Sequence, residues 1–270
     1  MVLNSILLLI LCIICYSSVV ICSYFFDKEG IFVWICVATV VSNITAASIG
    51  PMLGIHGVTL ANVPFATIFL STQILSTLYS KEDGFKGVYL SLFSSVIFLA
   101  VMMVCSYLVP EPYDSVTSHL NFLFSFGSYN MCNTVASVLM FFLANLSNVF
   151  LFNKLKGAFN NKNLWLANNI STIICNCIEN FAFVSLGLYL FPNIVFYLFP
   201  NCFDVSNLIP FSSCMQVALT TCVFEFILAI FDTPFLYLSL HLNKNKLNKN
   251  KLNINKNKLN INKNKLNINN

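Results

Sequence analysis

The sequence predicts an all-α, polytopic integral membrane protein, and three observations support this fold class. Of its 270 residues, 57% are apolar and only 9% are charged, with a mean hydropathy of +0.78. About a quarter of the residues in a soluble domain are charged, so this chain cannot cover itself with an ordinary hydrated surface. The apolar residues also gather in long runs, and the lysines between these runs fall on one side. A cytosolic enzyme, a secreted disulfide scaffold and an ordinary nucleic-acid-binding domain are thereby excluded, and we expect no nucleic-acid partner.

Seven apolar runs are long enough to cross the bilayer as helices, which takes about 20 residues for roughly 30 Å of hydrocarbon. They are residues 3–26, 31–49, 58–79, 87–109, 128–152, 165–191 and 210–240. The first run has no basic segment before it and is too long for the apolar part of a signal peptide, so we interpret it as a membrane helix. Together the runs predict a transmembrane domain over residues 1–242.

The distribution of charge supports the count of seven spans. All fourteen basic residues are lysines, and with seven alternating spans every lysine falls on one side of the membrane. The charged residues of the loops on the other side are all acidic, namely Glu111, Asp114 and Asp204. Because cytoplasmic loops are enriched in lysine and arginine, the pattern predicts an N-terminus outside and a C-terminus in the cytoplasm. The lysines before the tail are Lys28, Lys81, Lys86, Lys154, Lys156 and Lys162.

The C-terminal segment, residues 243–270, differs in composition from the rest of the chain. It holds eight of the fourteen lysines, and copies of KLNINKN begin at Lys251, Lys258 and Lys265, the last one cut short. Leucine and isoleucine lie two residues apart in each copy, which does not match a coiled-coil seam, and asparagine is a poor helix former. We therefore predict a disordered cationic tail in the cytoplasm, weakly attracted to anionic lipid.

Three acids lie within the predicted spans: Glu179, Glu225 and Asp232. A carboxylate at the centre of a bilayer costs on the order of 3 kcal/mol on insertion scales, so each needs a structural or functional reason. Glu225 and Asp232 are seven residues apart and share a face of the last span. Glu179 belongs to a polar stripe whose members are three or four residues apart, on one helical face. The stripe consists of Asn168, Thr172, Cys175, Asn176 and Glu179.

Other spans carry neutral polar side chains. Gln73 lies with polar neighbours in 58–79, Asn145 and Asn148 lie in 128–152, and Asn43 lies in 31–49. Such side chains either form hydrogen bonds between helices or line a cavity for a polar solute. Because five spans have polar faces, we favour a lined cavity, with Glu179 as its central acid.

The sequence lacks the motifs of the common enzyme classes. It contains no HExxH, GxxxxGK[ST], GxSxG or GxGxxG, and its three histidines are far apart. The eleven cysteines are scattered through apolar runs without metal-ligand spacing, so we interpret them as reduced thiols. We therefore expect that the protein is not an enzyme and has no catalytic residue, no metal site and no cofactor.

Several segments have the order and spacing of a known family. They include LANVPFATIFLSTQILSTLYSKEDGFKGV, NTVASVLMFFLANLSNVFLFNKLK, LWLANNISTIICNCIENFAFVSLGLY and EFILAIFDTPFLYLSL. Over about residues 25–240 the chain resembles the queuosine precursor transporter family, also called the vitamin-uptake-like transporter family. WLANNIST and FDTPFLYL are its most specific pieces. The resemblance implies a six-helix core from residue 31 onward, with 3–26 as an extra N-terminal transmembrane helix. It also implies a plasma-membrane importer of 7-deazaguanine bases, the precursors of queuosine in tRNA.

The resemblance and the polar stripes together predict a site for this small-molecule substrate. We expect Glu179, Gln73 and Asn148 to face the substrate path, and Asn43 and Asn169 to position the base. The site also includes Asp232, which the resemblance retains. Several family charges are exchanged in this chain: the family has an Asp at positions 73, 148 and 179 and a Lys at position 225.

Two alternative functions stay open at this point. Small six-helix vitamin-binding subunits have a similar size and composition, and they need a partner that hydrolyses ATP. The exchanged charges also fit a paralogue that has a different substrate or no transport activity. A homo-oligomer stays an open alternative to a single chain.

Overall fold

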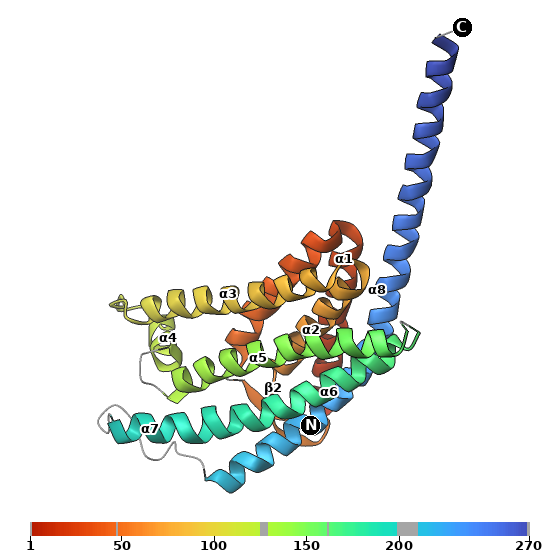
Figure 1. Ribbon diagram of the computed structural model, residues 1–270. Coiled ribbons are helices and arrows are strands. Elements are labelled where there is room, and N and C mark those ends of the chain that lie inside the picture. The colour runs from red at the N-terminus through yellow and green to blue at the C-terminus, as the bar shows by residue number, and fades with distance from the viewer. Residues whose placement is uncertain (1, 47, 125–128, 161, 199–209, 269–270) are drawn as a thin grey trace.

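Helices make up almost the whole chain, which confirms the predicted all-α, polytopic class (Figure 1). The computed structural model describes residues 2–46, 48–124, 129–160, 162–198 and 210–268. Asp204 and residue 128, where one predicted span begins, lie outside them. The elements are α1 (Val2–Thr45), β1 (Ile49–Met52), β2 (Ile55–Thr59), α2 (Asn62–Leu78), α3 (Lys81–Ser106), α4 (Val116–Phe124), α5 (Tyr129–Ala158), α6 (Leu164–Phe183), the π-helix η1 (Val184–Leu190), α7 (Phe191–Leu198) and α8 (Phe211–Ile268).

Helix α1 contains a break at Asp27, whose φ of 55° and ψ of −138° are not helical. Beyond the break the chain turns back along the first half of α1. Nδ2 of Asn4, at the start of α1, therefore reaches the carbonyl of Pro51, close to the end of the second half, and donates to it at 3.2 Å. The turn is tight, since a Cβ on Gly30 would lie only 2.3 Å from the carbonyl oxygen of Cys22. The runs 3–26 and 31–49 are thus two halves of one broken helix.

Five helices of the described residues are long and apolar enough to cross a membrane: Leu3–Thr45, Lys81–Ser106, Asn133–Ala158, Leu164–Leu198 and Phe211–Lys244. The first of these contains the break in α1, so it covers two of the predicted runs. Helix α2 has only 17 residues, which is short for crossing roughly 30 Å of hydrocarbon. The count of seven spans therefore stays a prediction. It requires that α2 crosses the membrane while other helices surround it.

A short antiparallel hairpin joins α1 to α2, where the sequence analysis expected the ends of two spans and a loop. Met52 pairs with Ile55 across a two-residue turn, in which Leu53 and Gly54 both have positive φ (53° and 80°). Two positive φ values give the turn the twist that a tight hairpin requires. The register shifts between Gly50 and Met52, at Pro51, which has no N–H to donate to the ladder.

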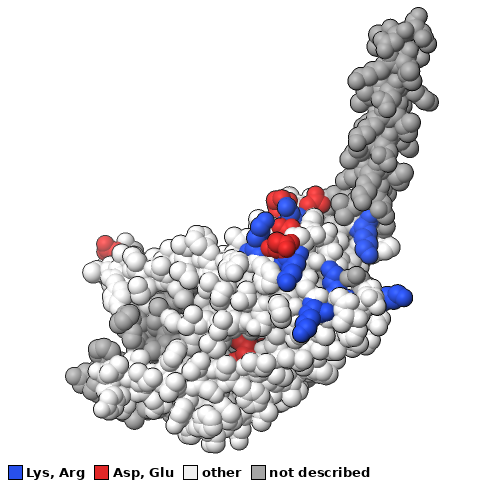
Figure 2. Space-filling model, in the orientation of Figure 1, with Lys and Arg blue, Asp and Glu red and all other residues white. Residues whose placement is uncertain are grey.

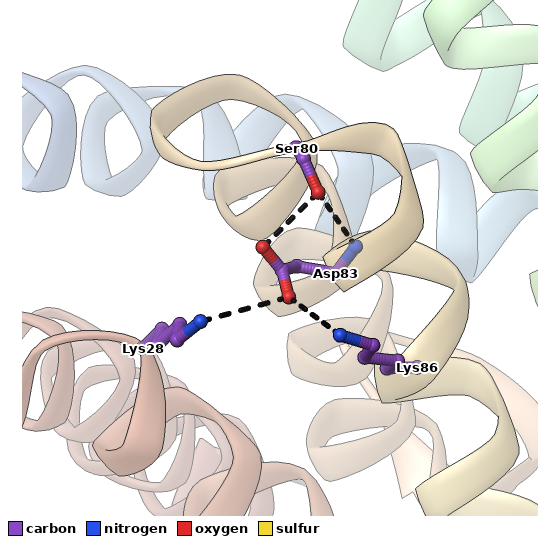
Figure 3. Close-up of polar contacts among 4 residues, drawn as sticks. All are labelled: Lys28, Ser80, Asp83 and Lys86. Atoms are coloured by element: carbon purple, nitrogen blue, oxygen red, sulfur yellow. Dashed lines mark hydrogen bonds and ion pairs between the residues drawn. The ribbon is translucent and has the colours of Figure 1, made fainter.

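Most of the charged side chains visible in Figure 2, including all the lysines, lie at one end of the bundle. There Ser80 caps α3 by accepting a hydrogen bond from the backbone N–H of Asp83 at 3.1 Å. The Asp83 carboxylate meets Lys86 at 3.5 Å and Lys28, beside the break in α1, at 3.9 Å (Figure 3). Nζ of Lys156 donates to the carbonyl of Ser76 at 2.9 Å, in the last turn of α2. Charged contacts thus tie α1, α2, α3 and α5 together at this end.

Helix α8 continues without a break past Pro234 to Ile268, and its last part extends away from the bundle (Figure 1). The sequence analysis predicted a disordered tail here, so the structure differs from that prediction. A helix that has already formed gains a hydrogen bond for each residue added, and leucine and lysine are good helix formers. Residues 165–191 also differ from one continuous α-helix, because they change to a π-helix at Val184.

Candidate functional site

The site is built on one face of α6, which we call the α6 ladder: Asn168, Thr172, Asn176 and Asn180. These residues are four apart, so they lie above one another on the helix. All four are buried, with exposed fractions of 5% or less. Because hydrocarbon offers no hydrogen-bond partners, buried amides in a membrane helix are satisfied by neighbouring helices or by a ligand.

Thr172 lies in a three-residue network that we call the central cluster, with Gln73 of α2 and Asn148 of α5. Nε2 of Gln73 donates to Oδ1 of Asn148 and to Oγ1 of Thr172, both at 3.0 Å. Nδ2 of Asn148 also donates to Oγ1 of Thr172, at 3.2 Å. None of the three is more than 2% exposed. The structure therefore brings together two of the predicted site residues, Gln73 of α2 and Asn148 of α5, with Thr172 of α6.

Several buried polar atoms around the central cluster have no hydrogen-bond partner in the described structure. They are the acceptors Oε1 of Gln73, Oδ1 of Asn176 and Oδ1 of Asn168, and the donor Nδ2 of Asn145. Asn145 lies one turn before Asn148 and accepts from Thr72 at 3.3 Å through its other amide atom. An unpaired buried polar group costs about 1–3 kcal/mol. A polar ligand with both donors and acceptors would remove this cost.

Aromatic rings lie one to two turns from the central cluster, towards the N-terminal ends of α2 and α5. The rings of Phe65 and Phe141 are 4.3 Å apart, and those of Phe69 and Phe141 are 5.3 Å apart. Phe69 is four residues before Gln73, and Phe141 is four residues before Asn145. Amides and aromatic faces therefore adjoin one another, a combination that suits a planar, polar ring.

The first turns of α6 pack against α8. Asn169 lies in these turns of α6, and Asp232 faces them from α8. Nδ2 of Asn168 donates to Oδ1 of Asp232 at 2.7 Å, and Asp232 is 1% exposed. Nδ2 of Asn169 donates to Oγ1 of Thr233 at 3.1 Å. The α6 ladder thus connects Asp232 to the central cluster, one helical turn away, whereas the amide of Asn169 joins α6 to α8 beside them.

Glu179 lies beyond the other end of the central cluster. It is seven residues from Thr172, a rise of about 10 Å along the helix, and it is partly buried. Its sequence neighbour Asn180 donates from Nδ2 to Oε2 of Glu225 on α8. The two acids therefore belong to the α6–α8 contact, and Glu179 is separated from Gln73 and Asn148.

Asn43 is placed apart from the other predicted site residues. Its Nδ2 donates to Oγ of Ser95 at 3.1 Å, and this bond joins the second half of α1 to α3. The sequence analysis did not name Ser95, Thr72 or Asn180. Asn180 could have been found, because it continues the four-residue spacing of the α6 ladder by one turn.

A groove of about 770 Å³ lies between α3, α5 and α6 on the described structure. None of the six predicted site residues lines this groove. Its walls are mostly apolar side chains such as Phe85, Phe150 and Ile178. A wall of this kind is expected on a surface that faces lipid, so we place the candidate site at the central cluster instead.

Comparison with known proteins indicates that the chain is similar to membrane transport proteins. The sequence model of a family described as putative vitamin uptake transporter matches residues 59–239. The chain is 25% identical over 213 residues to a protein of Bacillus subtilis (strain 168) named "Probable queuosine precursor transporter", which covers 78% of this chain and 84% of that protein. No solved structure matches the chain. Of the six predicted site residues, five lie within the matched range and Asn43 precedes it.

Proposed function

Because the chain belongs to the putative vitamin uptake transporter family, we propose that it imports queuosine precursors, the 7-deazaguanine bases, across the plasma membrane. The resemblance noted in the sequence is thereby confirmed at the level of the family. A multi-pass membrane transporter that acts on a small molecule is the general function. The base as substrate, its use in tRNA modification and the plasma membrane are the specific parts of the proposal. The name of the related Bacillus subtilis protein supports the choice of substrate.

The observation that carries the proposal is the central cluster with its unpaired polar atoms. A 7-deazaguanine base is a flat ring system whose edge presents N–H donors and a carbonyl acceptor. Oε1 of Gln73 and Oδ1 of Asn176 can accept from such donors, and Nδ2 of Asn145 can donate to the acceptor. The rings of Phe69 and Phe141 provide apolar faces beside them. We assign Gln73, Asn148 and Thr172 to the base site and Asn145 and Asn176 to its edge.

The remaining predicted site residues receive supporting roles in this proposal. Asp232 holds Asn168, and thereby the start of the α6 ladder, through the bond at 2.7 Å. Asn169 and Asn43 fix helix contacts, α6 to α8 and α1 to α3. Transport follows from alternating access around a site near the middle of the membrane. The lysine-rich end faces the cytoplasm, because basic residues are concentrated on that side of membrane proteins.

The test uses a bacterial strain that can neither synthesise nor import queuosine precursors. The strain expresses this chain, receives one 7-deazaguanine base at a time, and its tRNA is analysed for queuosine. Restored queuosine supports import and identifies the base that is carried. If tRNA stays without queuosine while the protein is present in the membrane, the proposed substrate is wrong. The Gln73→Leu variant serves as a matched control, because it changes the central cluster without adding a charge.

A further inference from the structure

Glu179 of α6 and Glu225 of α8 form an acid pair within the helical bundle. Asn180, the residue after Glu179, donates from Nδ2 to Oε2 of Glu225, so both acids belong to one contact between α6 and α8. α6 contains no lysine, and the first lysine of α8 is Lys244, nineteen residues after Glu225, so no lysine of these two helices is near the acids. Two carboxylates at one contact between membrane helices cannot both be ionised at an acceptable cost. The pair is therefore expected to hold a proton.

The groups that surround the acid pair are neutral or acidic. α6 contributes Cys177, and α8 contributes Cys222, which lies 3.7 Å from Nδ2 of Asn180. α1 contributes the hydroxyl of Tyr16, which already donates to the carbonyl of Leu228 at 3.4 Å. The nearest further acid is Asp232, two turns along α8.

The other helices that pack against α6 and α8 add no cation near the acid pair. α2 and α5 face them with the amides of Gln73 and Asn148, and Tyr189 of η1 packs on Phe211 at the start of α8. Within the described residues, the acid pair thus has no side chain that would balance two negative charges.

Asn176 gives an independent sign of a missing donor. Its Oδ1 accepts no hydrogen bond in the described structure, and the residue is only 5% exposed. It lies on the α6 ladder one turn before Asn180 and three residues before Glu179, between the acid pair and the central cluster. Ionised carboxylates only accept hydrogen bonds, so they cannot donate to Oδ1 of Asn176. A carboxyl group that binds a proton becomes a donor and can supply the donor that Oδ1 of Asn176 lacks.

We propose that the acid pair is a proton-binding site that couples uptake of the substrate to entry of a proton. This inference rests on the proposed function. With the site open to the outside, water reaches the pair and one proton binds, so the pair carries one negative charge at most while it is closed off from water. With the site open to the cytoplasm, the same proton leaves to water, and the pair returns to its first state. Asn176 links the two events, because its carbonyl oxygen can accept either from the protonated acid or from the substrate.

The experiment measures uptake of radiolabelled 7-deazaguanine into liposomes that contain the purified full chain. With one proton per base, an outside pH lower by about one unit is expected to raise accumulation by about tenfold. In Glu225→Gln and Glu179→Gln, this response to the pH gradient is lost, while exchange of base between the two sides without a gradient is retained. Glu111→Gln, an exposed acid outside the spans, is the matched control and keeps the wild-type response.

Wild-type uptake that ignores the pH gradient overturns the proton-binding site but leaves the proposed function intact. Uptake that follows a sodium gradient instead also overturns it. A second measurement does not depend on transport: infrared spectra of the purified protein at neutral pH should show the carbonyl band of a protonated carboxyl group. That band should be weaker in the Glu225→Gln, Glu179→Gln double variant, which leaves Asp232 in place, and unchanged in Glu111→Gln. Absence of the band in the wild-type protein contradicts the proposal, even if no base is transported.

Discussion

The side-chain amide of Gln73 on α2 donates to Oδ1 of Asn148 on α5 at 3.0 Å, and both residues are fully buried. Thr172 of α6 accepts from the same two amides. Three helices from distant parts of the sequence therefore meet through polar side chains at this point. Since amides in hydrocarbon need partners, this meeting point is where a polar molecule can replace protein hydrogen bonds with its own.

Gln73→Leu is expected to weaken binding of the base. The substitution keeps the volume but removes the acceptor Oε1 and the donor Nε2, and one lost hydrogen bond to a ligand costs about 1–3 kcal/mol, or about tenfold or more in affinity. Equilibrium binding of 7-deazaguanine to the purified protein measures the effect. Ser71→Ala is the control, because Ser71 is buried in the same helix and its hydroxyl donates only to the carbonyl of Thr67. Equal affinities in the two variants would exclude Gln73 from the site.

The bond between Asn168 and Asp232 is expected to stabilise the contact of α6 with α8. A double-mutant cycle with Asn168→Ala and Asp232→Ala should give a coupling of about 1–2 kcal/mol, in the range measured for hydrogen bonds between membrane helices. The measurement is the unfolding free energy in detergent of the wild type, both single variants and the double variant. A coupling of zero would mean that the 2.7 Å contact does not contribute to stability.

Asp83→Asn is expected to destabilise the lysine-rich end of the bundle. It removes the charge that pairs with Lys28 and Lys86, while Ser80 can still cap α3. Pairs of this kind contribute up to about 1 kcal/mol and weaken in salt. The melting temperature in detergent should therefore fall at low ionic strength, and the difference from wild type should shrink in high salt. A difference that does not change with salt would show that charge pairing is not its cause.

The orientation in the membrane can be tested with single cysteines. Ser115→Cys lies just before α4, at the end that is expected outside, and Lys162→Cys lies between α5 and α6, at the lysine-rich end; both positions are exposed. A maleimide that cannot cross the membrane should label Ser115→Cys in intact cells and Lys162→Cys only after the cells are opened. The unchanged chain controls for its native cysteines, and the reverse pattern would contradict the predicted orientation.

The sequence predicted the features that depend on one segment at a time. The four-residue spacing of Asn168, Thr172 and Asn176 was enough to place them on one face of α6, as the structure shows. It could not show that Thr172 meets Gln73 and Asn148, because contacts between helices depend on their packing angles and depths. The hairpin at Ile49–Thr59 was missed for a similar reason, since hydropathy alone does not separate a short strand from the end of a membrane helix.

Uptake of radiolabelled 7-deazaguanine into liposomes that contain only this purified protein tests the central claim most directly. The account predicts saturable uptake that exceeds the uptake of empty liposomes, that unlabelled base inhibits and that Gln73→Leu reduces. Uptake no greater than in empty liposomes, with the protein inserted and folded, would contradict the claim that this chain carries the base.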